Sequence, residues 1–269
     1  MTLLANALEK WNRKSLSGKC YTAGTSVLML VAGVLIMNPR TNPGTLSLFA
    51  AGPLLLFMAG FLIWIVPKLL AFGRSRVGTV PLVVLSALLA PFCLAGARQY
   101  VGAAVRLPPQ SFDVTVALYA VLYLPIAWAA VAVCILLLAF LVFPIAAMVS
   151  SSIRIPLQGF ATNPAGWFAR TLGRIESVEN EAINHALGGI VLAGVIVLFV
   201  ALYSKAVLNQ EVTRLMAYGL DFSQADMYPG IEPGRRMRLL DNGFVAYAER
   251  HGHDVQFDVK PLPPADKTK

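Results

Sequence analysis

The chain has 269 residues, of which 57% are hydrophobic and only 13% are charged, and its formal net charge is +8. Soluble domains are about one quarter charged, so this composition excludes a soluble domain as the bulk of the chain. The excess of lysine and arginine lies mostly in short segments beside apolar stretches. It is not gathered on a basic face interleaved with aromatics, which argues against a nucleic-acid partner. We therefore expect a lipid bilayer as the main surrounding.

Residues 1–19 are predicted to form a cytoplasmic amphipathic N-terminus. Leu4, Leu8 and Trp11 recur at helical spacing, and the basic side chains lie largely away from them. Such a segment lies on the membrane surface, with tryptophan at the interface. The alternative is that residues 2–16 simply extend the first membrane helix. No clear small-residue cleavage site follows the first apolar stretch, which favours a retained signal anchor.

Five apolar stretches without a charged side chain follow one another between residues 20 and 204. A hydrocarbon core about 30 Å thick needs about 20 apolar residues per crossing helix. These stretches predict a mainly α fold, a polytopic bundle of about five transmembrane helices. They cover residues 20–38, 46–66, 78–96, 114–149 and 186–204.

The flanking charges predict the orientation of the chain. Ten lysines and arginines flank the predicted inner ends of the stretches, against three on the other side. Basic loops stay in the cytoplasm, so we expect a multi-pass protein of the inner (plasma) membrane with a cytoplasmic N-terminus. Five crossings then place the C-terminus outside.

The stretch 114–149 is too long for an ordinary crossing. As one helix it would be about 54 Å long at about 1.5 Å per residue. Two tight crossings would turn the C-terminus inward, but the middle of the stretch has no turn residues and is rich in alanine. We predict one long helix, kinked near Pro125 or Pro144.

Residues 154–185 are predicted to be a cytoplasmic connector, marked at first by proline and glycine. From Arg170 to His185 the pattern favours a helix that leads into the last span. Its three glutamates are interpreted as a solvated face, with metal binding as the less favoured alternative. These glutamates are Glu176, Glu179 and Glu181.

Residues 205–260 are predicted to form an extracytoplasmic (periplasmic) α+β module. The pattern favours a helix from Val207 to Tyr218 that continues the last span and is capped by Gly219. Asp241-Asn242-Gly243 and His251-Gly252-His253 are turn signals between strand-forming runs, which predicts a three-stranded antiparallel meander. Residues 261–269 are expected to be a disordered tail.

The usual signs of catalysis, metal binding and cofactor binding are missing from the sequence. His251 and His253 flank a turn glycine and supply too few ligands for a metal site. Cys20, Cys93 and Cys134 are widely spaced and are interpreted as small apolar side chains. No phosphate-binding, nucleophile-elbow or zinc-protease motif occurs, and the spans lack ionisable groups at depth. We therefore expect no enzyme activity, no metal and no cofactor.

The last span carries small residues at steps of four and eight. Gly189, Ala193 and Ala201 would let another helix backbone approach closely. Internal bundling is the favoured interpretation, and binding to a partner's membrane helix is the alternative.

Without a catalytic set, the sequence favours a non-catalytic protein that acts by protein–protein contact in the cell envelope. It would be an accessory subunit of a membrane complex or an immunity-type inhibitor of a membrane-active toxin. The alternatives are a channel or uncoupled transporter, and a membrane enzyme using the connector glutamates with His185. Arginine and aromatic residues dominate binding hot spots, so the partner-binding candidates are Arg235, Arg236, Arg238, Phe244, Tyr247 and Phe257.

Overall fold

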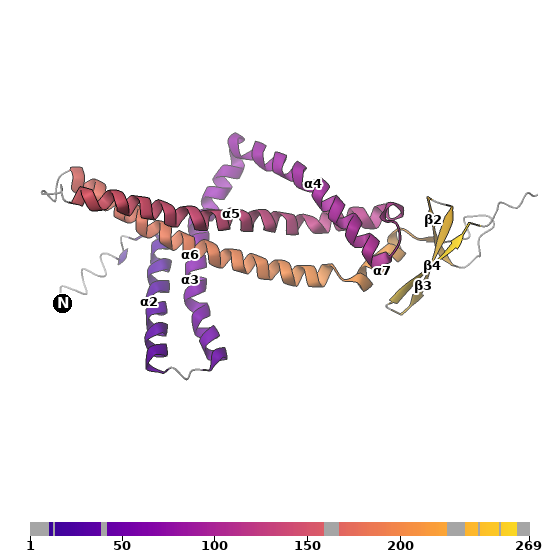
Figure 1. The fold of residues 1–269 in the computed structure, drawn as a ribbon, viewed down its shortest axis with the longest axis horizontal. Coiled ribbons are helices and arrows are strands. Elements are labelled where there is room, and N and C mark those ends of the chain that lie inside the picture. The colour runs from indigo at the N-terminus through magenta and orange to yellow at the C-terminus, as the bar shows by residue number, and fades with distance from the viewer. Residues whose placement is uncertain are drawn as a thin grey trace, which may run out of the picture. The chain divides into compact units, whose positions relative to one another are not determined.

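The computed structural model describes residues 11–12, 14–38, 42–158, 167–224, 235–241, 243–252 and 254–262. Side chains are described for these residues except 43, 45–48 and 153–180. Figure 1 shows long helices followed by a short helix and a small sheet. The predicted amphipathic segment at 2–16 lies largely outside the described residues, and the tail residues 263–269 lie outside them entirely.

Five helices are long and apolar enough to cross a membrane. This confirms the mainly helical fold class and the five predicted apolar helices. The helices are α2 (Leu16–Met37), α3 (Pro43–Arg74), α4 (Arg76–Val105), α5 (Asp113–Gln158) and α6 (Trp167–Val207).

Capping side chains explain where the first helices begin. The Ser15 hydroxyl accepts a hydrogen bond from the Gly18 amide at 3.2 Å and starts α2. Asn42 accepts from the Gly44 amide at 3.1 Å, and the proline that follows Asn42 suits the first turn of α3. Ser75 separates α3 from α4, because its hydroxyl donates to the Phe72 carbonyl and accepts from the Gly78 amide.

The long stretch after residue 113 forms one uninterrupted helix. Helix α5 has 46 residues and includes both Pro125 and Pro144. The prediction of a single helix rather than two short ones is therefore confirmed. At about 1.5 Å per residue, α5 is about 69 Å long, which exceeds a hydrocarbon core of about 30 Å.

The predicted connector 154–185 is mostly helical. Helix α5 runs on to Gln158, and α6 begins at Trp167 and continues through the last span to Val207. The predicted helix from Arg170 to His185 is confirmed as part of α6. Residues 159–166, which include three of the proline and glycine signals, lie outside the described residues.

The helix after the last span is separate from it, so the prediction of a continuous helix is wrong. Helix α7 (Gln210–Leu220) begins after Asn209, whose side chain accepts from the Glu211 amide at 2.9 Å. An asparagine in this position starts a new helix by satisfying an orphan amide. Helix α7 also runs past Gly219, the predicted cap, and ends at Leu220 before Asp221.

The sheet has four antiparallel strands in the order β1-β2-β3-β4. The three predicted strands are present as β2 (Arg236–Leu240), β3 (Phe244–His251) and β4 (Asp254–Pro261). The fourth is the two-residue β1 (Ser223–Gln224), which pairs with β2 and was too short for the sequence pattern to indicate. Gly243 and Gly252 have φ angles of 77° and 66° in the two predicted turns, a conformation that favours glycine.

Contacts divide the chain into two units. The first contains Met1–Thr79 and Val131–Val197, and the second contains Val80–Ala130 and Leu198–Lys269. In the first unit, α2 and α3 form a hairpin of neighbouring helices (Figure 1). In the second unit, the ends of α4 and α5 pack with α7 and one face of the sheet around a common apolar core.

Candidate functional site

A buried histidine with a tyrosine partner lies in the first unit. His185, on α6, is only 5% exposed. Its Nδ1 atom lies 2.7 Å from the hydroxyl oxygen of Tyr21, on α2. The His185 ring stacks on Trp64 of α3, with 3.9 Å between ring centroids and 26° between planes. The sequence placed His185 at the entrance of the last span, and the structure encloses it among aromatic rings.

Small residues make this enclosure sterically possible. A Cβ atom on Gly60 would lie 2.7 Å from Cε1 of Tyr21, so glycine leaves room for the ring that reaches His185. The ammonium group of Lys68 lies 3.5 Å from the centroid of the Trp64 ring, a cation–π contact. A polar side chain in the middle of an apolar surface is buried only when its hydrogen-bonding group finds a partner. Tyr21 supplies that partner for His185.

The residues of the enzyme alternative do not form a described catalytic set. Glu181 is exposed, whereas His185 is buried. The side chains of Glu176 and Glu179 lie outside the described ones. Among the described residues, no group of three or more histidine, cysteine, aspartate or glutamate side chains is placed to hold a metal. Convergence of these glutamates on His185 therefore stays a prediction.

The Tyr21→Phe substitution is expected to lower the free energy of unfolding by about 1–2 kcal/mol, because it leaves a buried imidazole nitrogen without its partner. Unfolding of the purified protein by SDS in mixed micelles measures this change. The double variant Tyr21→Phe/His185→Leu should recover part of the loss, because apolar side chains then replace both polar groups. If the double variant is no more stable than the single variant, the hydrogen bond is not the cause.

A buried carboxylate joins the C-terminal module to the long apolar helix α5 in the second unit. Asp221, which follows α7, is 2% exposed. It accepts hydrogen bonds from the amide of Val114 at 3.2 Å and from the amide of Thr115 at 3.0 Å. It also accepts a hydrogen bond from the hydroxyl of Thr115. These donors belong to the first turn of α5, where helix amides lack intrahelical acceptors and the helix dipole favours a negative charge. Asp221 therefore acts as a cap for a helix that begins more than 100 residues earlier in the chain.

Hydroxyl groups form a second buried connection, between α7 and the long helices α4 and α5. Thr213 is fully buried, and its Oγ1 lies 2.7 Å from the Tyr119 hydroxyl and 3.4 Å from the Tyr100 hydroxyl. The next residue, Arg214, donates from Nε to the Ala104 carbonyl at 2.8 Å, near the end of α4. Helix α7 is thus held by polar contacts to both α4 and α5.

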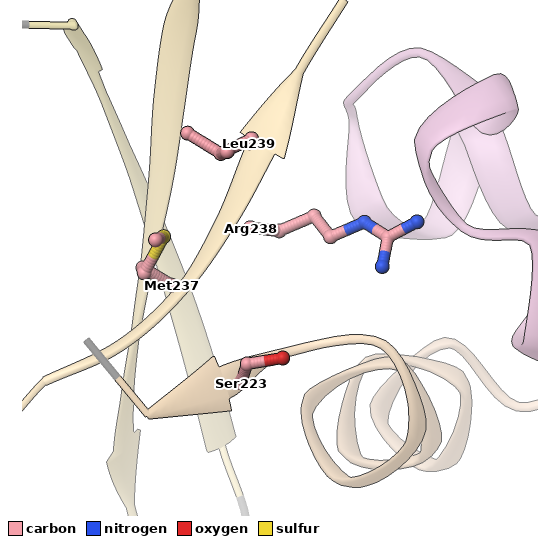
Figure 2. Close-up of a pocket in the computed structure, with 4 residues that line it drawn as sticks. All are labelled: Ser223, Met237, Arg238 and Leu239. Carbon is pink, nitrogen blue, oxygen red and sulfur yellow. The ribbon is translucent and has the colours of Figure 1, made fainter. Parts of the chain in front are cut away.

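Two predicted partner-binding arginines hold the sheet on α7. Arg236 donates to the Tyr218 carbonyl at 2.8 Å, and its guanidinium lies 4.7 Å from the centroid of the Tyr218 ring. Arg238 donates to the Asp221 carbonyl at 3.3 Å. Figure 2 shows the Arg238 side chain extending away from β2, on the opposite side from Met237. These arginines bind carbonyl groups at the end of α7, as basic side chains do at helix C-termini.

The other predicted partner-binding residues do not gather on one surface. Arg235 lies 2.6 Å from Glu249 in an ion pair, and Tyr247 is 5% exposed. Phe257 stacks on Phe222 with 5.3 Å between ring centroids, so it packs the sheet against the core. Phe244 is 40% exposed. The structure thus gives internal contacts to most of the set, and no finding tests their binding to a partner.

The predicted helix-packing residues have different surroundings. Gly189 and Ala193 are buried against Phe61 of α3 and Leu136 of α5, whereas Ala201 is exposed. Among the described glycines of α6, the closest approach is at Gly188, which the four-residue steps did not select. A Cβ atom there would lie 2.6 Å from Cβ of Phe61 and 2.7 Å from the Phe57 carbonyl oxygen.

A groove runs along the last strand of the module, beside the end of α4. Its volume is about 370 Å³. Strand β4 contributes Val255, Gln256, Phe257 and Val259, and α7 contributes Arg214. The segment at the end of α4 adds Arg106 and Leu107. The sequence analysis did not identify this groove, because its walls come from three segments far apart in the chain.

The chain matches no protein-family model, and no curated protein or solved structure matches it at a significant level. We therefore infer function from the geometry of the chain itself.

Proposed function

We propose that this is a non-catalytic integral membrane protein that acts by protein–protein contact through its C-terminal module. The observation that carries the proposal is the docking of this module on the membrane helices. Asp221 caps α5, Thr213 forms a hydrogen bond with Tyr119, and Arg236 fixes the sheet to α7. These polar contacts, of which the first two are buried, hold the sheet in one orientation, which is the arrangement expected of a binding platform rather than of a loosely tethered domain.

Contacts within each unit support the proposed topology. In the first unit, Tyr21, Trp64 and His185 meet, and all three lie at predicted cytoplasmic ends of apolar stretches. In the second unit, the start of α5 meets Asp221 of the tail, and both are predicted to lie outside. These pairings agree with alternating helix directions and with a single crossing by α5. The proposal therefore places the module outside an inner membrane, with the N-terminus in the cytoplasm.

The proposal includes two roles for the contact. The protein would be an accessory subunit of an envelope complex, or an immunity-type inhibitor that blocks a membrane-active toxin. Both roles need a platform fixed to the bilayer, and neither needs a catalytic group. The identity of the partner separates them.

Native mass spectrometry tests the proposed function. The protein is extracted from its own membrane in mild detergent after light cross-linking, and a second protein in stoichiometric amount is expected. Its identity then distinguishes a machine subunit from a toxin. A bare monomer or homo-oligomer would contradict the proposal, and flux or enzyme assays would then test the channel and enzyme alternatives.

A charge-reversal test at Arg236 or Arg238 would not isolate partner binding. Both side chains bind carbonyl groups at the end of α7, so glutamate at either position would release the sheet from its own helix. Variants that probe the contact need residues whose side chains and amides face outward.

A further inference from the structure

We propose that the groove between β4 and the end of α4 binds an extended acidic segment of the partner protein, which adds to the sheet as a fifth strand. This inference rests on the proposed function and names the chemistry of its contact surface. Three observations carry it: the outer edge of β4, with which no described strand pairs, the apolar wall beside that edge, and the positive charge of Arg106 and Arg214.

The hydrogen-bond pattern shows which groups of β4 face outward. Strand β4 is the last strand of the sheet, and the Leu262 amide donates to the Gly243 carbonyl at 2.9 Å. In an antiparallel pair, residues alternate between those that bond the neighbouring strand and those that point away. The backbone groups of Leu262 point toward β3, and so do those of the other even-numbered residues of β4. The amides and carbonyls of the odd-numbered residues Val255, Phe257 and Val259 therefore point away from β3.

The three outward-pointing residues line the groove. Val255, Phe257 and Val259 all belong to its wall. Among the described residues, no backbone group outside the sheet forms a hydrogen bond with any of these three residues. From residue 255 to residue 259 the edge spans about 13 Å at about 3.3 Å per residue, which suits an extended segment of about five residues. The next outward position is Pro261, which has no amide to offer and ends the edge.

The positive charge of the groove favours an acidic segment as its occupant. Arg106 is exposed, and no described carboxylate pairs with it. Arg214 lies 3.7 Å from Asp254, an exposed partner. Unpaired edge strands bind extended peptides through main-chain hydrogen bonds, and side chains set the specificity. Two guanidinium groups beside such an edge favour a segment that carries carboxylates.

Two substitutions of Val259 distinguish strand addition from electrostatic attraction alone. Val259→Pro removes an outward amide without removing a bond to β3, and Val259→Ala keeps that amide while trimming the same side chain. Arg106 has a φ of 61°, which is unusual for a residue with a side chain. Arg106→Gly therefore removes the charge and suits the backbone, so the thermal midpoint should not fall.

The binding test uses the full chain in nanodiscs of zwitterionic lipid. The probe is a fluorescein-labelled ten-residue peptide of alternating threonine and glutamate, measured by fluorescence anisotropy. We expect it to bind at least tenfold more tightly than the matching threonine and glutamine peptide. Val259→Pro and Arg106→Gly should each weaken binding at least tenfold, whereas Val259→Ala should change it less than threefold.

Several outcomes would overturn the inference. These are equal binding of the two peptides, absence of binding, or unchanged binding by Val259→Pro. If Arg106→Gly lowers the retention of phosphatidylglycerol but leaves peptide binding unchanged, the groove binds anionic lipid instead. Co-purification separates this inference from the proposed function. If a stoichiometric partner co-purifies with both Val259→Pro and Arg106→Gly, the groove is not its binding site, but the proposed function still holds. If no partner co-purifies with the wild-type protein, the proposed function is wrong.

Discussion

Replacing Gly188 by alanine is expected to lower the free energy of unfolding by about 3 kcal/mol, because overpacking of a close contact costs about 1–3 kcal/mol and sometimes more. The added Cβ would lie 2.7 Å from the Phe57 carbonyl oxygen and 2.6 Å from Cβ of Phe61. Neither atom can be moved by rotating a side chain, so α3 and α6 must separate. Membrane helices lack a strong hydrophobic drive toward each other, so their association depends on this close packing.

The neighbouring glycine provides a matched control. A Cβ on Gly189 would meet its nearest atoms at 3.7 Å, which is an ordinary van der Waals contact. Alanine also favours a helix over glycine by about 1 kcal/mol. Gly189→Ala should therefore be neutral or stabilising when both variants are unfolded by SDS in mixed micelles. Equal stabilities for the two variants would contradict the close approach at Gly188.

These two glycines show where the sequence stops being informative. Steps of four residues selected Gly189 and Ala193, which lie against Phe61 and Leu136, but the same rule also selected Ala201, which is exposed. The rule finds a stripe on one helix. It does not say which helix packs against it or at what rotation, and a rotation of a few tens of degrees decides between Gly188 and Gly189.

The coarse fold was predictable because its signals are local. Charge-free runs of about 20 residues predict membrane helices from the length needed to cross a bilayer. The turn at Gly243 was predicted from Asp241-Asn242-Gly243, and Gly243 adopts the left-handed conformation that this turn requires. The break between α6 and α7 also had a local signal, since Asn209 is a strong helix-starting residue. The prediction missed it because the apolar pattern continued across the boundary.

The polar contacts were not predictable to the same extent, because each joins residues far apart in sequence. Nothing near His185 indicates that Tyr21 is its partner. Asp221 carries a partial signal, since a carboxylate at a helix C-terminus faces the negative end of the dipole. An acidic residue in such a place implies a favourable partner elsewhere. The sequence alone does not identify that partner as the first turn of α5.

Replacing Asp221 by alanine is expected to release the C-terminal module and to lower the free energy of unfolding by about 3 kcal/mol, since hydrogen bonds to charged groups contribute about 1.5–3 kcal/mol. The amides of Val114 and Thr115 would lose their acceptor, and Asp221 is only 2% exposed, so water does not readily replace it. Asp221→Asn keeps one acceptor oxygen and should lose less. Hydrogen exchange at Val114 and Thr115 should accelerate about 100-fold in Asp221→Ala, because each 1.4 kcal/mol corresponds to a factor of ten.

Asp258→Ala is the control for this experiment. Asp258 is an exposed aspartate of the same module, 3.7 Å from Lys260, and surface ion pairs contribute at most about 1 kcal/mol. Its removal should leave the exchange at α5 unchanged. If Asp221→Ala also leaves that exchange unchanged, the module is not held by this carboxylate, and its fixed orientation loses its main support. If exchange rises at α5 and along β2–β4 together, the carboxylate couples the C-terminal sheet to the start of α5, and the proposed partner, when bound to the sheet, would in turn stabilise the start of α5.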